Sequence, residues 1–148
     1  KENGDEKAFC CLYATARDFG KLGQLIANRG KWGNEQLIPS WYFEEMVSIP
    51  DYMTTEESIK NYQYGLHIWT YQGYSSPVYY CRGILGQYII SIPDEDLVIV
   101  RLGEKRTKSI QLDGKDVSDE QLKKVGHSSD FLKYINFAEQ IRKEAEKK

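Results

Sequence analysis

The stretch that decides the fold is residues 78–103, which read VYYCRGILGQYIISIPDEDLVIVRLG. Three runs within it are rich in aromatic and β-branched residues, which favour β-strands: Val78–Gly83, Gly86–Ile92 and Leu97–Leu102. Between the last two runs lies Pro93-Asp94-Glu95-Asp96, whose residue types favour a tight turn. Because short connections join antiparallel neighbours, the stretch predicts three consecutive antiparallel strands.

A further strand and two helices are predicted before this stretch. The aromatic run Tyr62–Tyr71 is the further strand. The first helix begins near Thr15, since this capping residue is followed by a carboxylate three positions on, and it stops at Gly30. The second helix is short: Ser40 is its predicted N-cap, and it runs through about Val47.

A longer helix is predicted from Ser128 or Ser129 to near the end of the chain. Its apolar face consists of Phe131, Ile135, Ala138 and Ile141. Before it, residues 103–117 read as charged and irregular around a turn at Asp113-Gly114, and Ser118 is expected to cap one helical turn over Asp119–Lys124. The whole order predicts an α+β fold in a single domain over residues 1–148. An antiparallel sheet of about four strands carries the C-terminal helix on one face, with two N-terminal helices beside it.

The composition of the chain excludes several classes of function. The 148 residues are 41% hydrophobic and 28% charged, as in a globular domain, and the net charge of −2 gives no basic surface for nucleic acid. No apolar run is long enough to span a bilayer. The three cysteines (Cys10, Cys11, Cys81) and two histidines (His67, His127) show no metal-ligand spacing. We therefore expect no disulfide framework, no metal site and no cofactor.

The motifs of activated nucleophiles are missing from the sequence. It contains no Ser-x-x-Lys, no Gly-x-Ser-x-Gly and no Gly-rich phosphate loop. Its carboxylates lie in polar stretches typical of solvated surface, and His67, inside a predicted strand, is expected to be a packed or edge residue. No catalytic residue can therefore be assigned within the chain.

The deciding stretch resembles the C-terminal half of serine β-lactamases, penicillin-binding proteins and related esterases and amidases. In these families the third motif, Lys-Thr-Gly or His-x-Gly, lies on a strand. A turn, a Gly-aromatic strand ending in Pro, a second turn and a Val/Ile-rich strand follow. Here Gly83 takes the place of the motif glycine, Gly86-Gln87-Tyr88 that of the next strand's start, Pro93 that of the proline, and Leu97–Gly103 that of the last strand. With upstream segments, the resemblance covers about Ala14–Gly103.

Within these families, the class C-like esterase and 6-aminohexanoate-oligomer hydrolase branch is most similar, because it tolerates a Gly-x-x-Gly-Gln junction. The resemblance implies a bacterial enzyme that hydrolyses a small ester, amide or β-lactam through a seryl ester. It also implies that the Ser-x-x-Lys and Tyr-x-Asn/Ser motifs lie upstream of residue 1. Members are often periplasmic or attached to the cell envelope, which is the location expected for the parent protein.

The resemblance places one wall of the substrate cleft in this chain, with the N–H of Ile84 as an oxyanion donor. The implied cleft residues are Cys81, Arg82, Gly83, Ile84, Gly86 and Gln87. Cys81 occupies the slot of the family's lysine or histidine, and the neighbouring Arg82 is a candidate to provide positive charge to a substrate carboxylate.

Two other functions stay open at this point. The vacant lysine or histidine slot favours a non-catalytic binding or regulatory protein on the same scaffold, and the missing catalytic set favours a complete, small α+β interaction module. The leading hypothesis also makes a prediction about the edge of the sheet. Without the upstream strands, the apolar run Leu97–Leu102 would have an open edge, through which we expect the chain to associate with a second copy unless its own N-terminal residues cover that edge.

Overall fold

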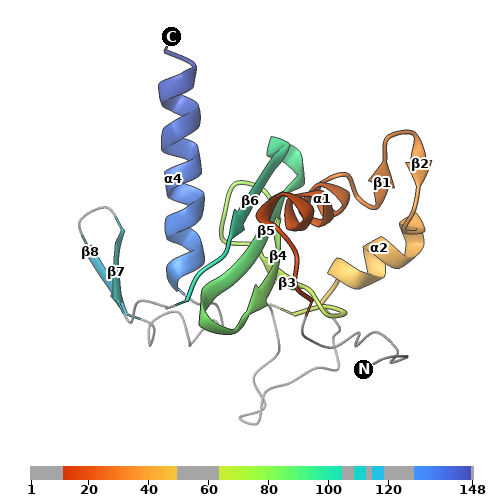
Figure 1. Ribbon diagram of the computed structural model, residues 1–148, viewed down its shortest axis with the longest axis horizontal. Coiled ribbons are helices and arrows are strands. Elements are labelled where there is room, and N and C mark those ends of the chain that lie inside the picture. The colour runs from red at the N-terminus through yellow and green to blue at the C-terminus, as the bar shows by residue number, and fades with distance from the viewer. Residues whose placement is uncertain (1–11, 50–63, 105–108, 113–114, 119–128, 148) are drawn as a thin grey trace.

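The computed structural model describes residues 12–49, 64–104, 109–112, 115–118 and 129–147, which form three α-helices and three antiparallel sheets (Figure 1). The helices are α1 (Ala16–Ala27), α2 (Ser40–Val47) and α4 (Ser129–Ala145). The central sheet has the order β3 (Trp69–Tyr71), β4 (Val78–Gly83), β5 (Gln87–Ile92) and β6 (Leu97–Arg101). Two hairpins pair β1 (Lys31–Trp32) with β2 (Glu35–Gln36) and β7 (Ser109–Leu112) with β8 (Lys115–Ser118). The predicted α+β fold is confirmed.

The meander of β4, β5 and β6 is the centre of the fold, as predicted. β4 and β5 are antiparallel with Cys81 opposite Ile89, and β5 and β6 are antiparallel with Ile90 opposite Ile99. Two short 3₁₀ turns make the connections, η1 (Ile84–Gly86) and η2 (Pro93–Glu95). The observed strands are slightly shorter than predicted, because Gly86 belongs to the first turn and Leu102 follows the last strand.

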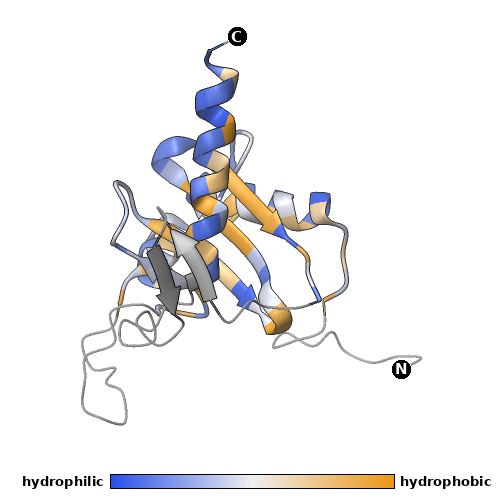
Figure 2. Cartoon of the chain, turned by 90° about the vertical axis from the view of Figure 1, so that its left-hand side faces the viewer, coloured by the Kyte–Doolittle hydropathy of each residue, from blue (hydrophilic) through white to orange (hydrophobic). Residues whose placement is uncertain are grey.

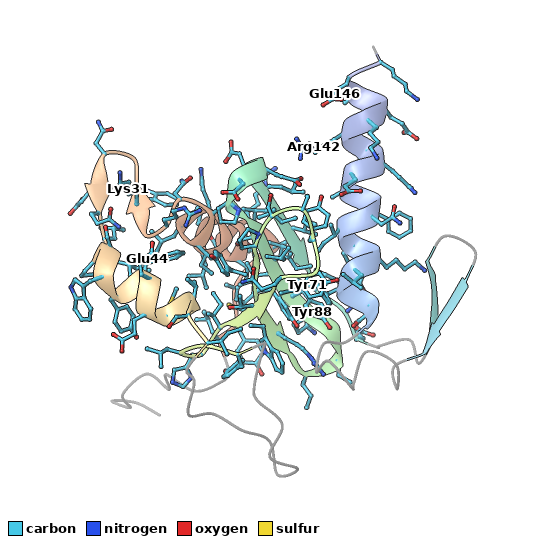
Figure 3. All side chains as sticks on the ribbon, turned by 180° about the vertical axis from the view of Figure 1, so that it is seen from behind. Lys31, Glu44, Tyr71, Tyr88, Arg142 and Glu146 are labelled. Carbon is cyan, nitrogen blue, oxygen red and sulfur yellow. The ribbon has the colours of Figure 1, made fainter. Side chains whose placement is uncertain are left out.

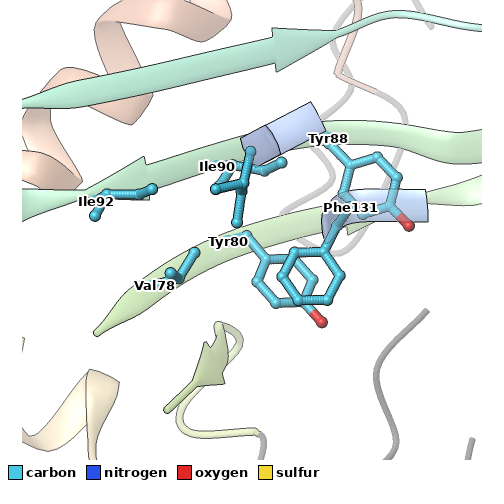
Figure 4. Close-up of a cluster of buried hydrophobic side chains, with 7 residues drawn as sticks. Val78, Tyr80, Tyr88, Ile90, Ile92 and Phe131 are labelled. Carbon is cyan, nitrogen blue, oxygen red and sulfur yellow. The ribbon is translucent and has the colours of Figure 1, made fainter. Parts of the chain in front are cut away.

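One face of the sheet packs against the first turns of α4. The buried cluster there consists of Val78, Tyr80, Tyr88, Ile90, Ile92, Phe131 and Ile135 (Figure 4). Phe131 is fully buried and stacks on Tyr80, with ring centroids 4.8 Å apart. Tyr71 and Tyr88 also lie beside this end of the helix (Figure 3). Burial of large aromatic side chains stabilises this contact.

The opposite face packs against α1, so the sheet is covered on both sides. Gly23 makes this close contact sterically feasible: a Cβ at that position would lie 2.4 Å from Val98 Cγ1 and 2.9 Å from Ile89 Cγ2. The buried Ser91 hydroxyl donates to the Gly23 carbonyl oxygen at 2.9 Å, which satisfies the one polar side chain in this part of β5. Two-sided burial explains why β5 reads as a nearly continuous apolar run.

Both predicted N-terminal helices form, with one correction to their caps. The Thr15 side chain accepts from the N–H of Asp18, as the capping pattern predicted, and Gly30 follows the helix with a φ of +84°. Ser40 is the first residue of α2 rather than its N-cap; Pro39 is the N-cap and makes no side-chain hydrogen bond. The backbone of Pro39 is still non-helical, with φ −51° and ψ 137°.

The strand predicted over Tyr62–Tyr71 is much shorter. Within residues 64–71, the described part of this run, Trp69–Tyr71 is the only strand, with an isolated bridge from Tyr64 to Trp69. His67 lies in a bend with a φ of +60°, and its side chain is exposed, so its assignment to a strand was wrong. A backbone in the left-handed region cannot continue a β-ladder.

Two predictions near the C-terminus also differ. Ile141 does not share the buried face of α4, since it is 67% exposed. The C-terminal end of α4 extends away from the rest of the fold (Figure 2). The stretch read as irregular contains the β7–β8 hairpin, with β8 ending at Ser118. Residues 51–61, whose polar sequence reads as a loop, and the predicted helical turn over 119–124 lie outside the described residues.

Candidate functional site

The six implied cleft residues lie at one end of the central sheet, where β4 turns into β5. Gly83 ends β4 and is paired with Gln87, the first residue of β5. Ile84, Leu85 and Gly86 form the connecting turn η1. The predicted strand–turn–strand arrangement is therefore present, while the role of these residues in a substrate cleft stays a prediction.

The backbone of this turn is conformationally demanding. Leu85 has φ 60° and ψ 19°, and the buried Gly86 has a φ of +83°. Glycine adopts this left-handed region without penalty, whereas the region is unfavourable by about 1–2 kcal/mol for a residue with a Cβ. Such conformations persist only where the surroundings fix them, and they concentrate at functional sites.

The turn presents two apolar side chains to the exterior. Ile84 is 84% exposed and Leu85 is 50% exposed. Gly83 is also exposed, and a Cβ there would lie 3.0 Å from Gln87 Cβ. The exposed surface of the turn therefore consists of backbone and apolar side-chain atoms.

Arg101, on the neighbouring strand β6, contacts the turn from within the fold. Its Nη1 donates to the carbonyl oxygens of Leu85, at 3.3 Å, and Gly86. The guanidinium carbon lies 5.4 Å from the ring centroid of Tyr134 on α4. No sequence signal indicated this contact, because the turn lies fifteen or sixteen residues away from Arg101 along the chain.

Gln87 ties the start of β5 to the residues that follow β6. Its side-chain amide donates to the Gly103 carbonyl oxygen, and its Oε1 accepts from the Gly103 N–H at 3.0 Å. This pair of bonds replaces the backbone ladder after Arg101, where β6 has ended. The Gln87 side chain therefore connects the start of β5 to the segment after β6 and does not extend into solvent.

Cys81 and Arg82 point to opposite faces of the sheet, as successive strand residues must. Cys81 packs against the buried cluster of Ile26, Phe43, Val47, Ile68 and Tyr79, and burial raises the pKa of its thiol. It therefore presents no charge at the position where the hydrolases that the sequence resembles have lysine or histidine. The Arg82 guanidinium carbon lies 5.4 Å from the ring centroid of Trp69, on the face that also packs against α4.

Comparisons with known proteins assign no role to these residues. No protein-family model matches the chain, and no curated protein matches it either. Within the described ranges, no three His, Cys, Asp or Glu side chains are grouped so that they could hold a metal ion. In that same part of the chain, every helix is too short or too polar to cross a bilayer.

Proposed function

We propose that this chain is the C-terminal part of a bacterial serine hydrolase of the β-lactamase and penicillin-binding-protein type. Its most similar branch is that of class C-like esterases and 6-aminohexanoate-oligomer hydrolases. The observation that carries the proposal is the β4–β5 turn: it follows Arg82-Gly83, its carbonyl oxygens accept from Arg101, and Ile84, its first residue, is 84% exposed. The meander with α4 packed on it supports the same scaffold.

In this proposal the chain forms one wall of a substrate cleft and provides no nucleophile. A serine from the residues before Lys1 attacks the carbonyl carbon of an ester, amide or β-lactam, and its proton passes to a base of that segment. The carbonyl oxygen becomes an oxyanion, to which the N–H of Ile84 donates. The C–O or C–N bond then breaks, the leaving group takes up the proton, and water hydrolyses the seryl ester. The periplasm or cell envelope is the expected location.

The test requires the longer chain encoded with the residues that precede Lys1. We expect that segment to contain Ser-x-x-Lys followed by Tyr-x-Asn/Ser, and the longer protein to react with a fluorophosphonate probe and to hydrolyse p-nitrophenyl acetate or nitrocefin. The 148-residue chain alone should do neither. Stoichiometric labelling of a serine within residues 1–148 would contradict the proposal.

Replacement of Ile84 separates the backbone donor from the side chain. Ile84→Pro removes the N–H at the first position of a helical turn, where proline fits, and Gly83 already has the extended backbone (φ −107°, ψ 173°) that a following proline requires. Ile84→Ala keeps the N–H. Loss of one oxyanion donor lowers kcat by about 10²–10³-fold. The kcat of the Ile84→Pro variant should therefore fall by that factor, and the kcat of the Ile84→Ala variant by far less. Equal losses of kcat in both variants would show that the Ile84 N–H does not stabilise the oxyanion.

A second candidate function is a non-catalytic binding or regulatory protein on the same scaffold. The position of Cys81 favours it, because the thiol in the slot of the family's lysine or histidine packs into an apolar cluster. This candidate predicts that the longer protein lacks a Ser-x-x-Lys motif, does not react with the fluorophosphonate and still binds an ester, amide or β-lactam.

A further inference from the structure

The β4–β5 turn requires support from outside its own residues. Leu85 and Gly86 are consecutive left-handed residues, and a leucine in this region is unfavourable by about 1–2 kcal/mol. The exposed side chains of Ile84 and Leu85 contribute little packing that could fix the turn. Contacts from neighbouring elements must therefore hold the conformation.

The carbonyl oxygens of the turn receive that support from Arg101. Its Nη1 donates to the oxygens of both Leu85 and Gly86, and charged donors make hydrogen bonds stronger than neutral ones. Gly103 makes room for this side chain, since a Cβ there would lie 2.1 Å from Arg101 Nη1. Gln87 in turn holds Gly103 by both of its backbone groups.

The same guanidinium is fixed from the side of α4. Tyr134 lies with its ring centroid 5.4 Å from the Arg101 guanidinium carbon, within the range of a cation–π contact. Tyr134 also packs against Tyr88, with ring centroids 5.8 Å apart, so α4, β5 and β6 meet at this point. The Arg101 guanidinium therefore contacts both α4 and the β4–β5 turn.

We propose that Arg101 is a positioning residue, which holds the carbonyl oxygens of Leu85 and Gly86 toward the fold so that the Ile84 end of the turn faces the reacting carbonyl group. This inference rests on the proposed function and deepens it. Arg101 touches no substrate; it acts through the turn. Tyr134 assists by fixing the plane of the guanidinium.

The experiment uses Arg101→Gln, with Arg142→Gln as the matched control. Arg142 is also an arginine, but it pairs at 2.8 Å with Glu95 of η2, in the β5–β6 connection and not in the β4–β5 turn. In the 148-residue chain, Arg101→Gln should shift the ¹H–¹⁵N resonances of residues 84–87, and Arg142→Gln should leave them unchanged. In the longer chain, kcat should fall by about 10²-fold with a much smaller change in KM, as expected of a misplaced catalytic group.

Three further variants keep the test decisive if Arg101→Gln does not fold. Tyr134→Leu removes the aromatic ring while Arg101 stays in place, and Tyr134→Phe retains the ring. The first should move the turn resonances and lower kcat, and the second should do so far less. Arg101→Lys keeps the charge without the planar fork, so it should restore part of the lost kcat.

The outcomes separate this inference from the proposed function. Unchanged resonances of residues 84–87 in Arg101→Gln and Tyr134→Leu, with hydrolysis intact, would overturn the role of Arg101 alone. A longer wild-type chain without hydrolysis would overturn the proposed function and with it any catalytic role of Arg101. In that case the resonance shifts would still establish that Arg101 holds the turn.

Discussion

The hydroxyl of Tyr88 donates a 2.7 Å hydrogen bond to Asp130 Oδ1, and both side chains are almost fully buried. Tyr88 lies at the start of β5, and Asp130 lies in the first turn of α4, forty-two residues further along the chain. A buried polar contact at this separation fixes the position of the helix on the sheet, since neither group can turn to solvent instead.

Tyr88→Phe should therefore destabilise the fold. The change removes a buried donor to a carboxylate and leaves the ring, so the free energy of unfolding should fall by about 1–3 kcal/mol in a urea titration. Tyr13→Phe is the control, because Tyr13 is 94% exposed and should give no change. Equal midpoints for the two variants would show that the bond contributes nothing to stability.

Two glycines of α1 should respond to alanine in opposite directions. At Gly23 a Cβ would lie 2.4 Å from Val98 Cγ1, so Gly23→Ala should cost about 1–3 kcal/mol by overpacking. At Gly20 the nearest atom is 4.0 Å away, and Gly20→Ala should stabilise by up to about 1 kcal/mol through helix propensity. Thermal unfolding followed by circular dichroism measures both. If both alanine variants were more stable than the parent, the close packing of α1 on the sheet at Gly23 would be contradicted.

Two phenylalanines of α4 provide a similar comparison. Phe131 is fully buried against Tyr80 and Tyr71, and Phe131→Ala should cost about 3–5 kcal/mol. Phe137 is 50% exposed, with Lys133 5.7 Å from its ring centroid, so Phe137→Ala should cost about 0.5 kcal/mol. Urea denaturation gives both values, and a large loss at Phe137 would reveal a contact that this packing does not contain.

The Cys81 thiol should react slowly in the native chain. Burial raises its pKa above the ordinary value of 9.0, so the thiolate, which is the reactive form, is disfavoured. Alkylation by iodoacetamide should be measured in a Cys10→Ser, Cys11→Ser background, against the same chain in urea. Equal rates would contradict the burial.

The same pKa shift predicts how Cys81 affects stability at alkaline pH. The folded state binds this proton more tightly than the unfolded state does. The contribution of the Cys81 thiol to the free energy of unfolding is therefore fully present below pH 9.0. It is lost as the pH rises through the raised pKa of the folded state. Cys81→Ala should accordingly lose less stability than the parent between pH 9 and the folded-state pKa.

Self-association through β6 stays a prediction. Within the described part of the chain β6 pairs with β5 alone, so its other edge has no partner strand there. Sedimentation velocity should show a concentration-dependent dimer. Leu102→Lys adds a charge next to this edge and should weaken the dimer, whereas Leu12→Lys, at a residue 71% exposed in the wild type, should not. A monomer at every concentration would contradict self-association and would leave coverage of this edge by the chain's own N-terminal residues as the remaining expectation.

Local sequence signals determined the elements around the candidate site. The strand-forming runs and the turn Pro93–Glu95 predicted the β4–β5–β6 meander, and the Thr15 cap predicted the start of α1. The six implied cleft residues could be placed together for the same reason, because 81–87 is one continuous segment across a single turn. Propensities and turn chemistry act over a few neighbouring residues, and the sequence displays them directly.

Only the tertiary structure decided what surrounds that segment. Arg101 reaches Gly86 across fifteen residues, Ser91 bonds to Gly23 across sixty-eight, and Cys81 packs into a cluster with residues from both α1 and α2. The second covered face of the sheet depends on the fit of Gly23 against Val98, which no periodicity expresses. Such contacts arise from the shape and packing of elements once they are assembled, and close packing is a property of the whole interior rather than of any local stretch.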